Sequence, residues 1–165
     1  GDEVGFQEYF VGLRHDVPVS GIRFDGADDA LPGPGVLEAI TTAEAVVVAP
    51  SNPLVSIAPI LAVPGVRDAV AARRESAVAV SPIVGGSALK GPADRMLAEM
   101  GHESSVVGVA RLYRDLVATL VIDRVDADLA AEVEAEGVRC VVTDTVMRTT
   151  EVAAALAETT LGTMA

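Results

Sequence analysis

Four short apolar runs, rich in β-branched residues, set the strongest limit on what this chain of 165 residues can fold into. They lie at residues 45–49, 76–80, 119–122 and 138–142. Runs with little polar alternation are typical of strands that are covered on both faces. Each run is followed by turn residues and then by a segment of helical composition. This alternation predicts an α/β fold with a three-layer, Rossmann-like and mostly parallel sheet.

The segments between the runs carry helix start and stop signals. We predict helices at 34–43, 64–74, 92–100, 127–136 and 150–160, so that strand–helix units alternate over residues 34–165. Gly101 and Gly137 stand where helix C-caps are expected, and Pro34 stands in a first turn. Residues 1–28 lack this pattern. We expect two exposed strands there, at 4–11 and 17–24, forming a sheet edge or a hairpin.

The charge balance excludes two classes of partner. With 12 basic and 24 acidic residues, the formal net charge is −12. Nucleic-acid phosphates and anionic membrane surfaces are bound by clustered Lys and Arg, so neither is expected as a partner. No apolar stretch approaches the roughly 18 residues that span a bilayer. The first residues lack the basic start and long apolar segment of a signal peptide, so we expect a cytoplasmic protein.

The chain has one cysteine, Cys140, which excludes an internal disulfide and a cysteine zinc cluster. It lies inside the fourth apolar run. The sequence therefore predicts a buried structural thiol rather than a reactive one.

Ligands of parallel α/β sheets bind at the carboxyl ends of the strands, which directs attention to the loops after each run. In the loop at 50–59, Ser51 or Asn52 can cap a following helix whose first position is Pro53. The N–H groups at a helix N-terminus attract anions such as phosphate. An ordinary cap with nothing bound is the alternative.

The loop at 81–92 contains Gly85 and Gly86, which permit close approach of the backbone to a ligand. Lys90 in the same loop is the only lysine of the chain and is a candidate phosphate contact. The spacing does not match the phosphate-binding motif G-x-x-x-x-G-K-[ST]. A flexible loop with a solvated lysine is the alternative.

The third and fourth loops offer carboxylates and hydroxyls. Asp123 or Asp126 fits a ribose hydroxyl or a metal, and equally fits a helix cap. Residues 143–145 have the same ambiguity. His15 and His102 stand far apart without metal-ligand spacing. The residues thus predict a site for a nucleotide or another phosphorylated ligand, and they leave the reaction open.

The string at residues 49–67, APSNPLVSIAPILAVPGVR, resembles the signature of the 2-phospho-L-lactate transferase family. Further similar stretches follow the family's order, at 6–11, 35–40, 80–86, 89–94, 113, 122–123 and 143–147. The resemblance implies transfer of a phospholactyl group, or in actinobacterial relatives a phosphoenolpyruvyl group, from a guanosine diphosphate conjugate to the deazaflavin precursor Fo. GMP leaves, magnesium is required, and the product belongs to biosynthesis of the deazaflavin coenzyme factor 420.

The resemblance also implies roles for individual residues. The loop holding Ser51, Asn52, Pro53 and Ser56 would contact the nucleotide of the donor. Weaker candidates for the neighbouring wall are Gly85, Gly86 and Lys90. Catalytic residues are not identified.

Family members are much longer than this chain, and the glycine-rich first loop and metal-binding aspartates of their N-terminal half are absent from it. The resemblance therefore implies that residues 1–165 are the C-terminal part of a single transferase domain, with no metal ligands of their own and the Mg²⁺ ligands elsewhere. The expected partner is a chain carrying the N-terminal half, or a second copy. Two other hypotheses remain: a non-catalytic nucleotide or sugar-nucleotide binding module of the same fold, and a structural fragment paired through an exposed sheet edge.

Overall fold

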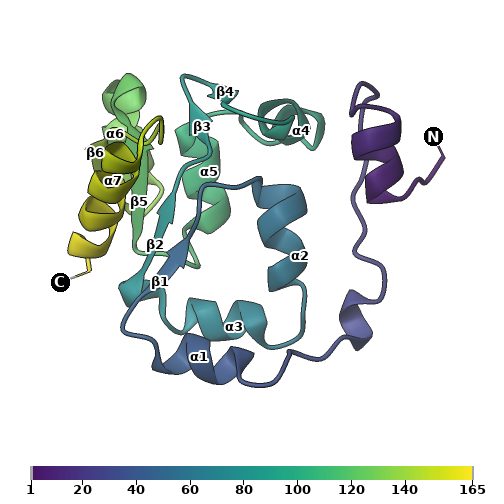
Figure 1. The fold of residues 1–165 in the computed structure, drawn as a ribbon, viewed down its shortest axis with the longest axis horizontal. Helices are drawn as coiled ribbons and strands as arrows, with labels where there is room; N and C mark the ends of the chain where they lie inside the picture. Colours follow the sequence, from purple (N-terminus) through teal and green to yellow (C-terminus); the bar gives the residue numbers. More distant parts are fainter. Residues whose placement is uncertain (1, 165) are drawn as a thin grey trace.

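The computed structural model describes residues 2–164 and is organised around one parallel sheet of four strands (Figure 1). The strands are β1 (Val46–Val48), β2 (Ala77–Val80), β5 (Thr119–Asp123) and β6 (Arg139–Thr143). They lie in the order β1-β2-β5-β6, and every pairing between neighbours is parallel. The four apolar runs are therefore the four strands, and the predicted α/β class is confirmed.

In the described part of the chain, seven α-helices connect and cover the strands: α1 (Val36–Thr42), α2 (Ala58–Leu61), α3 (Val66–Ala71), α4 (Ala93–Glu99), α5 (Val106–Tyr113), α6 (Ala130–Ala135) and α7 (Thr150–Gly162). Shorter helical turns are η1 (Glu8–Gly12), η2 (Ala27–Asp29), η3 (Pro53–Ile57), η4 (Arg74–Ser76) and η5 (Arg124–Leu129). Helix α5 has no counterpart among the predictions. Six of its eight residues are buried and Arg111 is the one that is exposed, so the polar residues that mark an amphipathic helix in a sequence are few. No helix in the described part of the chain has the length and apolarity needed to cross a membrane.

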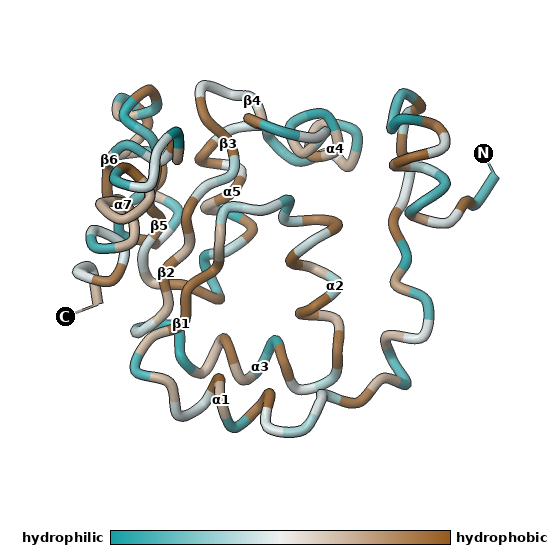
Figure 2. The backbone as a smooth tube through the Cα atoms, in the orientation of Figure 1, coloured by the Kyte–Doolittle hydropathy of each residue, from teal (hydrophilic) through white to brown (hydrophobic). Residues whose placement is uncertain are grey.

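The larger part of the core lies on one face of the sheet. The alternate strand residues Ala77, Ala79, Leu120 and Ile122 pack there against helices that precede and follow them. Helices α3 to α6 supply most of the buried partners, among them Val70, Leu97, Val109 and Val133. Figure 2 shows β1 and β2 as largely hydrophobic tubes. The core is aliphatic, as the low aromatic content of the sequence requires.

The opposite face of the sheet carries a smaller cluster. Val78, Val80 and Val121 are buried there against Leu156 of α7. Figure 1 shows α7 on the other side of the strands from α2 and α4. The three layers are therefore present, with one outer layer made of several helices and the other of α7.

The prediction of two strands within residues 1–28 is wrong for residues 2–28, which contain no strand. A π-helical turn, η1, occupies the first of the two stretches. Phe6 and Phe10, four residues apart, stack with their ring centroids 5.4 Å apart, and Tyr9 is buried. This i, i+4 contact requires helical spacing, and the alternation of apolar and polar residues concealed it. In the second stretch, the N–H of Val19 donates to the Glu99 carboxylate instead of to a neighbouring strand.

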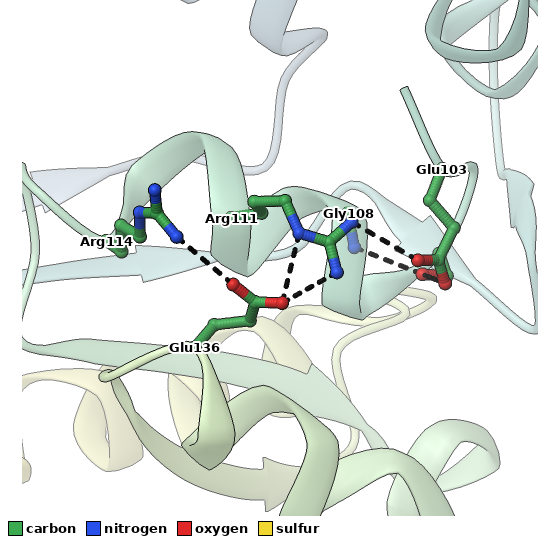
Figure 3. Close-up of polar contacts among 6 residues, drawn as sticks. Glu103, Gly108, Arg111, Arg114 and Glu136 are labelled. Atoms are coloured by element: carbon green, nitrogen blue, oxygen red, sulfur yellow. Dashed lines mark hydrogen bonds and ion pairs between the residues drawn. The ribbon is translucent and has the colours of Figure 1, made fainter. Parts of the chain in front are cut away.

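An ion-pair cluster fastens α5 to the end of α6 on the outer surface (Figure 3). The Glu136 carboxylate accepts from Arg111, with Nη2 2.6 Å from Oε1, and pairs with Arg114 at 3.4 Å. Arg111 also reaches Glu103 at 3.4 Å. The arginine side chains are about half exposed, so the cluster contributes little to stability and marks no ligand site.

Candidate functional site

A cavity of about 660 Å³ lies at the carboxyl ends of the strands, the edge at which parallel sheets bind ligands. The loops after β1, β2 and β6 supply three of its walls. Its lining includes Pro50, Ser51, Asn52, Val55 and Ser56; Ser81 and Pro82; Ala88 to Ala93; Thr145 to Arg148; and, from the N-terminal segment, Phe6 and Phe10. Three loops that are far apart in the sequence thus meet at one site because the four strands are parallel.

Of the two predicted caps, Ser51 and Asn52, Asn52 is the N-cap of η3. Its Oδ1 accepts from the N–H groups of Leu54 and Val55, at 2.9 and 3.3 Å. Its carbonyl oxygen accepts from Ser56 and Ile57, at 3.0 and 3.1 Å. Pro53, the first helical residue, has no N–H to offer. The first-turn donors of this helix are therefore all engaged within the chain, so the expectation of free N–H groups for an anion is wrong.

The polar side chains of the same loop remain open to the cavity. Ser51 and Ser56 line it, and no hydrogen bond within residues 2–164 engages either hydroxyl. Asn52 also lines it, with its amide nitrogen 3.6 Å from the Met96 sulfur. Pro53 is buried beneath the loop and lies outside the lining. Hydroxyl groups, rather than backbone N–H groups, are what this loop presents to a ligand.

Gly85 and Gly86 form the two-residue turn of a β-hairpin between β3 (Ile83–Val84) and β4 (Ser87–Ala88). Both have positive φ, +60° and +77°, as this kind of turn requires. Neither residue lines the cavity, so the structure does not join them to the other predicted site residues. A Gly-Gly pair that directly follows an apolar pair, Ile83-Val84, is itself a hairpin signal, and this signal would have identified the turn.

Two cationic side chains line the cavity. Lys90 follows the hairpin, and Arg148 follows β6. Within residues 2–164, no ion pair or side-chain hydrogen bond engages either group. Lys90 is a predicted phosphate contact, whereas Arg148 was not predicted, although Arg148 lies in a loop after the fourth apolar run. Lys90 and Arg148 therefore bring two cationic groups without a partner in the described residues to one cavity, although the chain is strongly acidic. Such a cavity suits an anionic ligand such as a phosphate.

A buried carboxylate joins the ends of β5 and β6. Asp123 accepts from the N–H and hydroxyl of Thr145, at 2.8 and 3.0 Å, and caps the next turn by accepting from Val125 N–H. Burial opposes ionisation of Asp123, but the hydrogen bonds from Thr145 and Val125 outweigh it, and its pKa lies below the ordinary value. The cap interpretation is thus the correct one. The carboxylate also positions the segment that leads to Arg148.

The carboxylates near the cavity do not form a magnesium site. The carboxylate oxygens of Asp123 and Asp126 accept hydrogen bonds from other residues of the chain. Within residues 2–164, no three His, Cys, Asp or Glu side chains lie close enough together to hold a metal ion. The Mg²⁺ implied by the family resemblance therefore does not fit the described residues.

These features define a class: a parallel α/β domain whose binding edge presents hydroxyls and two cations to an anionic ligand. The chain belongs to the family described as 2-phospho-L-lactate transferase CofD, whose model matches residues 1–161.

Individual relatives agree with this membership. The chain is 46% identical over 159 residues to the phosphoenolpyruvate transferase of Streptomyces griseus, a match that covers 96% of this chain and 50% of that protein. It is 36% identical over 148 residues to the 2-phospho-L-lactate transferase of Methanocaldococcus jannaschii, covering 90% of this chain and 46% of that protein. The chain thus spans about half the length of these relatives.

Proposed function

We propose that this chain forms part of a transferase that moves a phospholactyl or phosphoenolpyruvyl group from a guanosine diphosphate conjugate to Fo. GMP is the leaving group, and the reaction serves biosynthesis of coenzyme factor 420. One observation carries the proposal: four of the predicted nucleotide-binding residues line one cavity at the carboxyl edge of the sheet, namely Ser51, Asn52, Ser56 and Lys90. The first three come from the loop that carries the family signature.

The proposed reaction is a displacement at phosphorus. A ribityl hydroxyl oxygen of Fo bonds to the phosphorus that bears the lactyl or enolpyruvyl oxygen. The bond from that phosphorus to the bridging oxygen breaks, and GMP departs with the electron pair, while the hydroxyl proton is lost to solvent. Such chemistry depends mainly on positioning and on neutralisation of phosphate charge. Lys90 and Arg148 would neutralise the phosphates, and the hydroxyls of Ser51 and Ser56 would donate hydrogen bonds to them.

The remaining length of the relatives suggests what completes the site. Strand β1 is one of the two outer strands of the sheet within residues 2–164, and its Val47 is 46% exposed. An edge strand with an exposed apolar side chain favours further pairing. We propose that the part of the relatives that this chain does not match extends the sheet beside β1 and supplies the Mg²⁺ ligands. A second copy of this chain is the alternative occupant of that edge.

A non-catalytic nucleotide or sugar-nucleotide binding module is the second candidate. It is favoured by the carboxylates of Asp123 and Asp126, which are engaged within the chain and leave the cavity without metal ligands of its own. Such a module would retain the binding edge and lack turnover under every condition.

Calorimetric titration with GDP, UDP-glucose and NAD separates the candidates. We expect GDP to bind preferentially and Lys90→Ala or Arg148→Ala to weaken it about tenfold, as loss of a charge-assisted contact does. Arg67→Ala is the matched control, because Arg67 is exposed on α3 and lies outside the cavity. A preference for UDP-glucose or NAD would favour the binding module, and flat titrations with all three would reject a nucleotide site.

A further inference from the structure

Two phenylalanines stand at the cavity in a chain that is poor in aromatic residues. Phe6 and Phe10 are two of the three phenylalanines, and aromatic residues make up 3% of the sequence. Their ring centroids lie 5.4 Å apart with an interplanar angle of 27°, and both line the cavity. Phe6 is 49% exposed. A stacked aromatic pair left open to solvent is unusual for a core of Val, Ala, Leu and Ile, and it forms an apolar wall at a polar site.

The pair is held in position by a clamp on α4. Tyr9, between the two phenylalanines, is 7% exposed, and its hydroxyl oxygen accepts from Arg95 Nη2 at 2.9 Å. The same arginine donates to the carbonyl oxygen of His15 and pairs with Glu99 at 3.0 Å. Tyr9 therefore anchors the turn η1 on one side, and the phenylalanine rings face the cavity from it. Figure 1 shows this N-terminal segment on the α4 side of the molecule, well away from the sheet.

The remaining lining shows what the aromatic wall faces. Val55, Leu89 and Met147 continue the apolar surface, whereas Lys90 and Arg148 are cationic. A flat, apolar ring against the aromatic wall and an anionic group beside the cations satisfy both surfaces, whether one molecule or two neighbouring molecules supply them. Flat rings stack on aromatic side chains with offset or tilted geometry, and anions pair with the cations.

We propose that Phe6 and Phe10 form the stacking wall for the flat heteroaromatic ring of a substrate, while Lys90 and Arg148 hold the phosphates of the donor. This inference rests on the proposed function, which supplies two sources of such a ring. One is the guanine of the donor, and the other is the deazaflavin of the acceptor Fo. The chemistry they share is a planar heteroaromatic face.

The test uses GDP by calorimetry and Fo by its fluorescence, on the wild-type chain and on Phe6→Leu and Phe10→Leu. Leucine keeps an apolar side chain and removes the ring. We expect each variant to bind one of the two ligands about threefold to tenfold more weakly, the range that aromatic pairs support. Phe6→Tyr, which restores a ring, is expected to restore affinity. Phe24→Leu is the matched control, because Phe24 lies outside the cavity.

The possible results test the stacking wall separately from the proposed transferase function. Weakened Fo binding assigns the wall to the acceptor, and weakened GDP binding assigns it to the donor base. Wild-type binding that both leucine variants retain in full would overturn the stacking wall and leave the proposed function standing. A wild-type chain that binds neither ligand would overturn both. Weakening by Phe6→Leu that Phe6→Tyr does not restore, with a lowered thermal midpoint, would show a structural role and also overturn the inference.

Discussion

Asp126 accepts the backbone N–H of Gly85 with both carboxylate oxygens, which lie 3.1 and 2.9 Å from the amide nitrogen. This contact spans 41 residues and fixes the Gly85-Gly86 turn of the β3–β4 hairpin to the start of η5. Asp126 is 4% exposed. A carboxylate that fits a metal in the sequence is thus a structural acceptor in the fold, and the glycine beside it has no free N–H for a phosphate.

Replacing Asp126 should therefore cost stability. Asp126→Ala leaves a partly buried N–H without its acceptor, and we expect a loss of about 1–3 kcal/mol in the free energy of unfolding. Urea denaturation monitored by circular dichroism measures it. Asp128→Ala is the control, because Asp128 is exposed in the same turn. Equal effects of the two substitutions would show that the Gly85 contact contributes nothing measurable.

Asp123 should give the chain an acid-sensitive contribution to stability. Its pKa in the folded chain lies below the ordinary value of 3.8 because hydrogen bonds from Thr145 and Val125 outweigh the effect of burial. A depressed folded pKa contributes stability that is present above the unfolded value and is lost as the pH falls through the folded value. We expect Asp123→Asn to be less stable than wild type at pH 7, with a difference that shrinks toward pH 3.

Urea titrations at several pH values check this. Asp115→Asn is the control, because Asp115 is exposed. A difference between wild type and Asp123→Asn that stays constant from pH 7 to below pH 3 would contradict the assignment.

Gly108 should tolerate no side chain. A Cβ atom there would lie 1.9 Å from the carbonyl oxygen of Glu103, a backbone atom that cannot swing away. Ser105 caps α5 at the same point by accepting from the Gly108 N–H at 3.1 Å. The gain in helix propensity of about 1 kcal/mol is smaller than the clash, so Gly108→Ala should lower stability by about 1–3 kcal/mol.

Gly162→Ala provides the comparison, since a Cβ at the end of α7 meets nothing within 4 Å. Its thermal midpoint should stay unchanged or rise slightly. A Gly108→Ala chain as stable as wild type would show that the turn before α5 rearranges freely.

Cys140 should react slowly with thiol reagents in the native chain. It is half-buried rather than fully buried as predicted, and burial, with a smaller effect of Glu134, raises its pKa to about 11. The thiolate is the reactive form, so little of it is present near pH 8. Absorbance with a chromogenic disulfide should show slow labelling in buffer and rapid labelling in urea. Equal rates in the two conditions would exclude this protection.

The sequence predicts the sheet well because a parallel strand covered on both faces leaves a continuous apolar run. The runs at 45–49 and 119–122 match β1 and β5 to within one residue at either end. The prediction of a strand at residues 4–11 was wrong because Phe6 and Phe10 make a helical contact. Apolar and polar residues also alternate in this stretch, which favoured a strand. Helix α5 was missed because it is buried on nearly all sides.

The site was predictable wherever topology decides it. Residues that directly follow the strands, such as Ser51 and Thr145, share one edge because the strands are parallel. Gly85 does not line the cavity because it lies at the tip of the β3–β4 hairpin. No local sequence pattern indicates that Asp126 accepts a hydrogen bond from the Gly85 N–H. The presence of Phe6 in the lining depends on the Tyr9–Arg95 contact across 86 residues. Such long-range contacts leave no periodic signal.

We propose that this chain supplies one part of a transferase site. The most direct test measures GMP release from the guanosine diphosphate conjugate in the presence of Fo and Mg²⁺. The chain is assayed alone and together with the part of the Streptomyces griseus enzyme that it does not match. We predict weak or no release by the chain alone and restored release by the pair, reduced by Lys90→Ala. Full turnover by the isolated chain, or no release by a pair that forms a stable complex, would contradict the account.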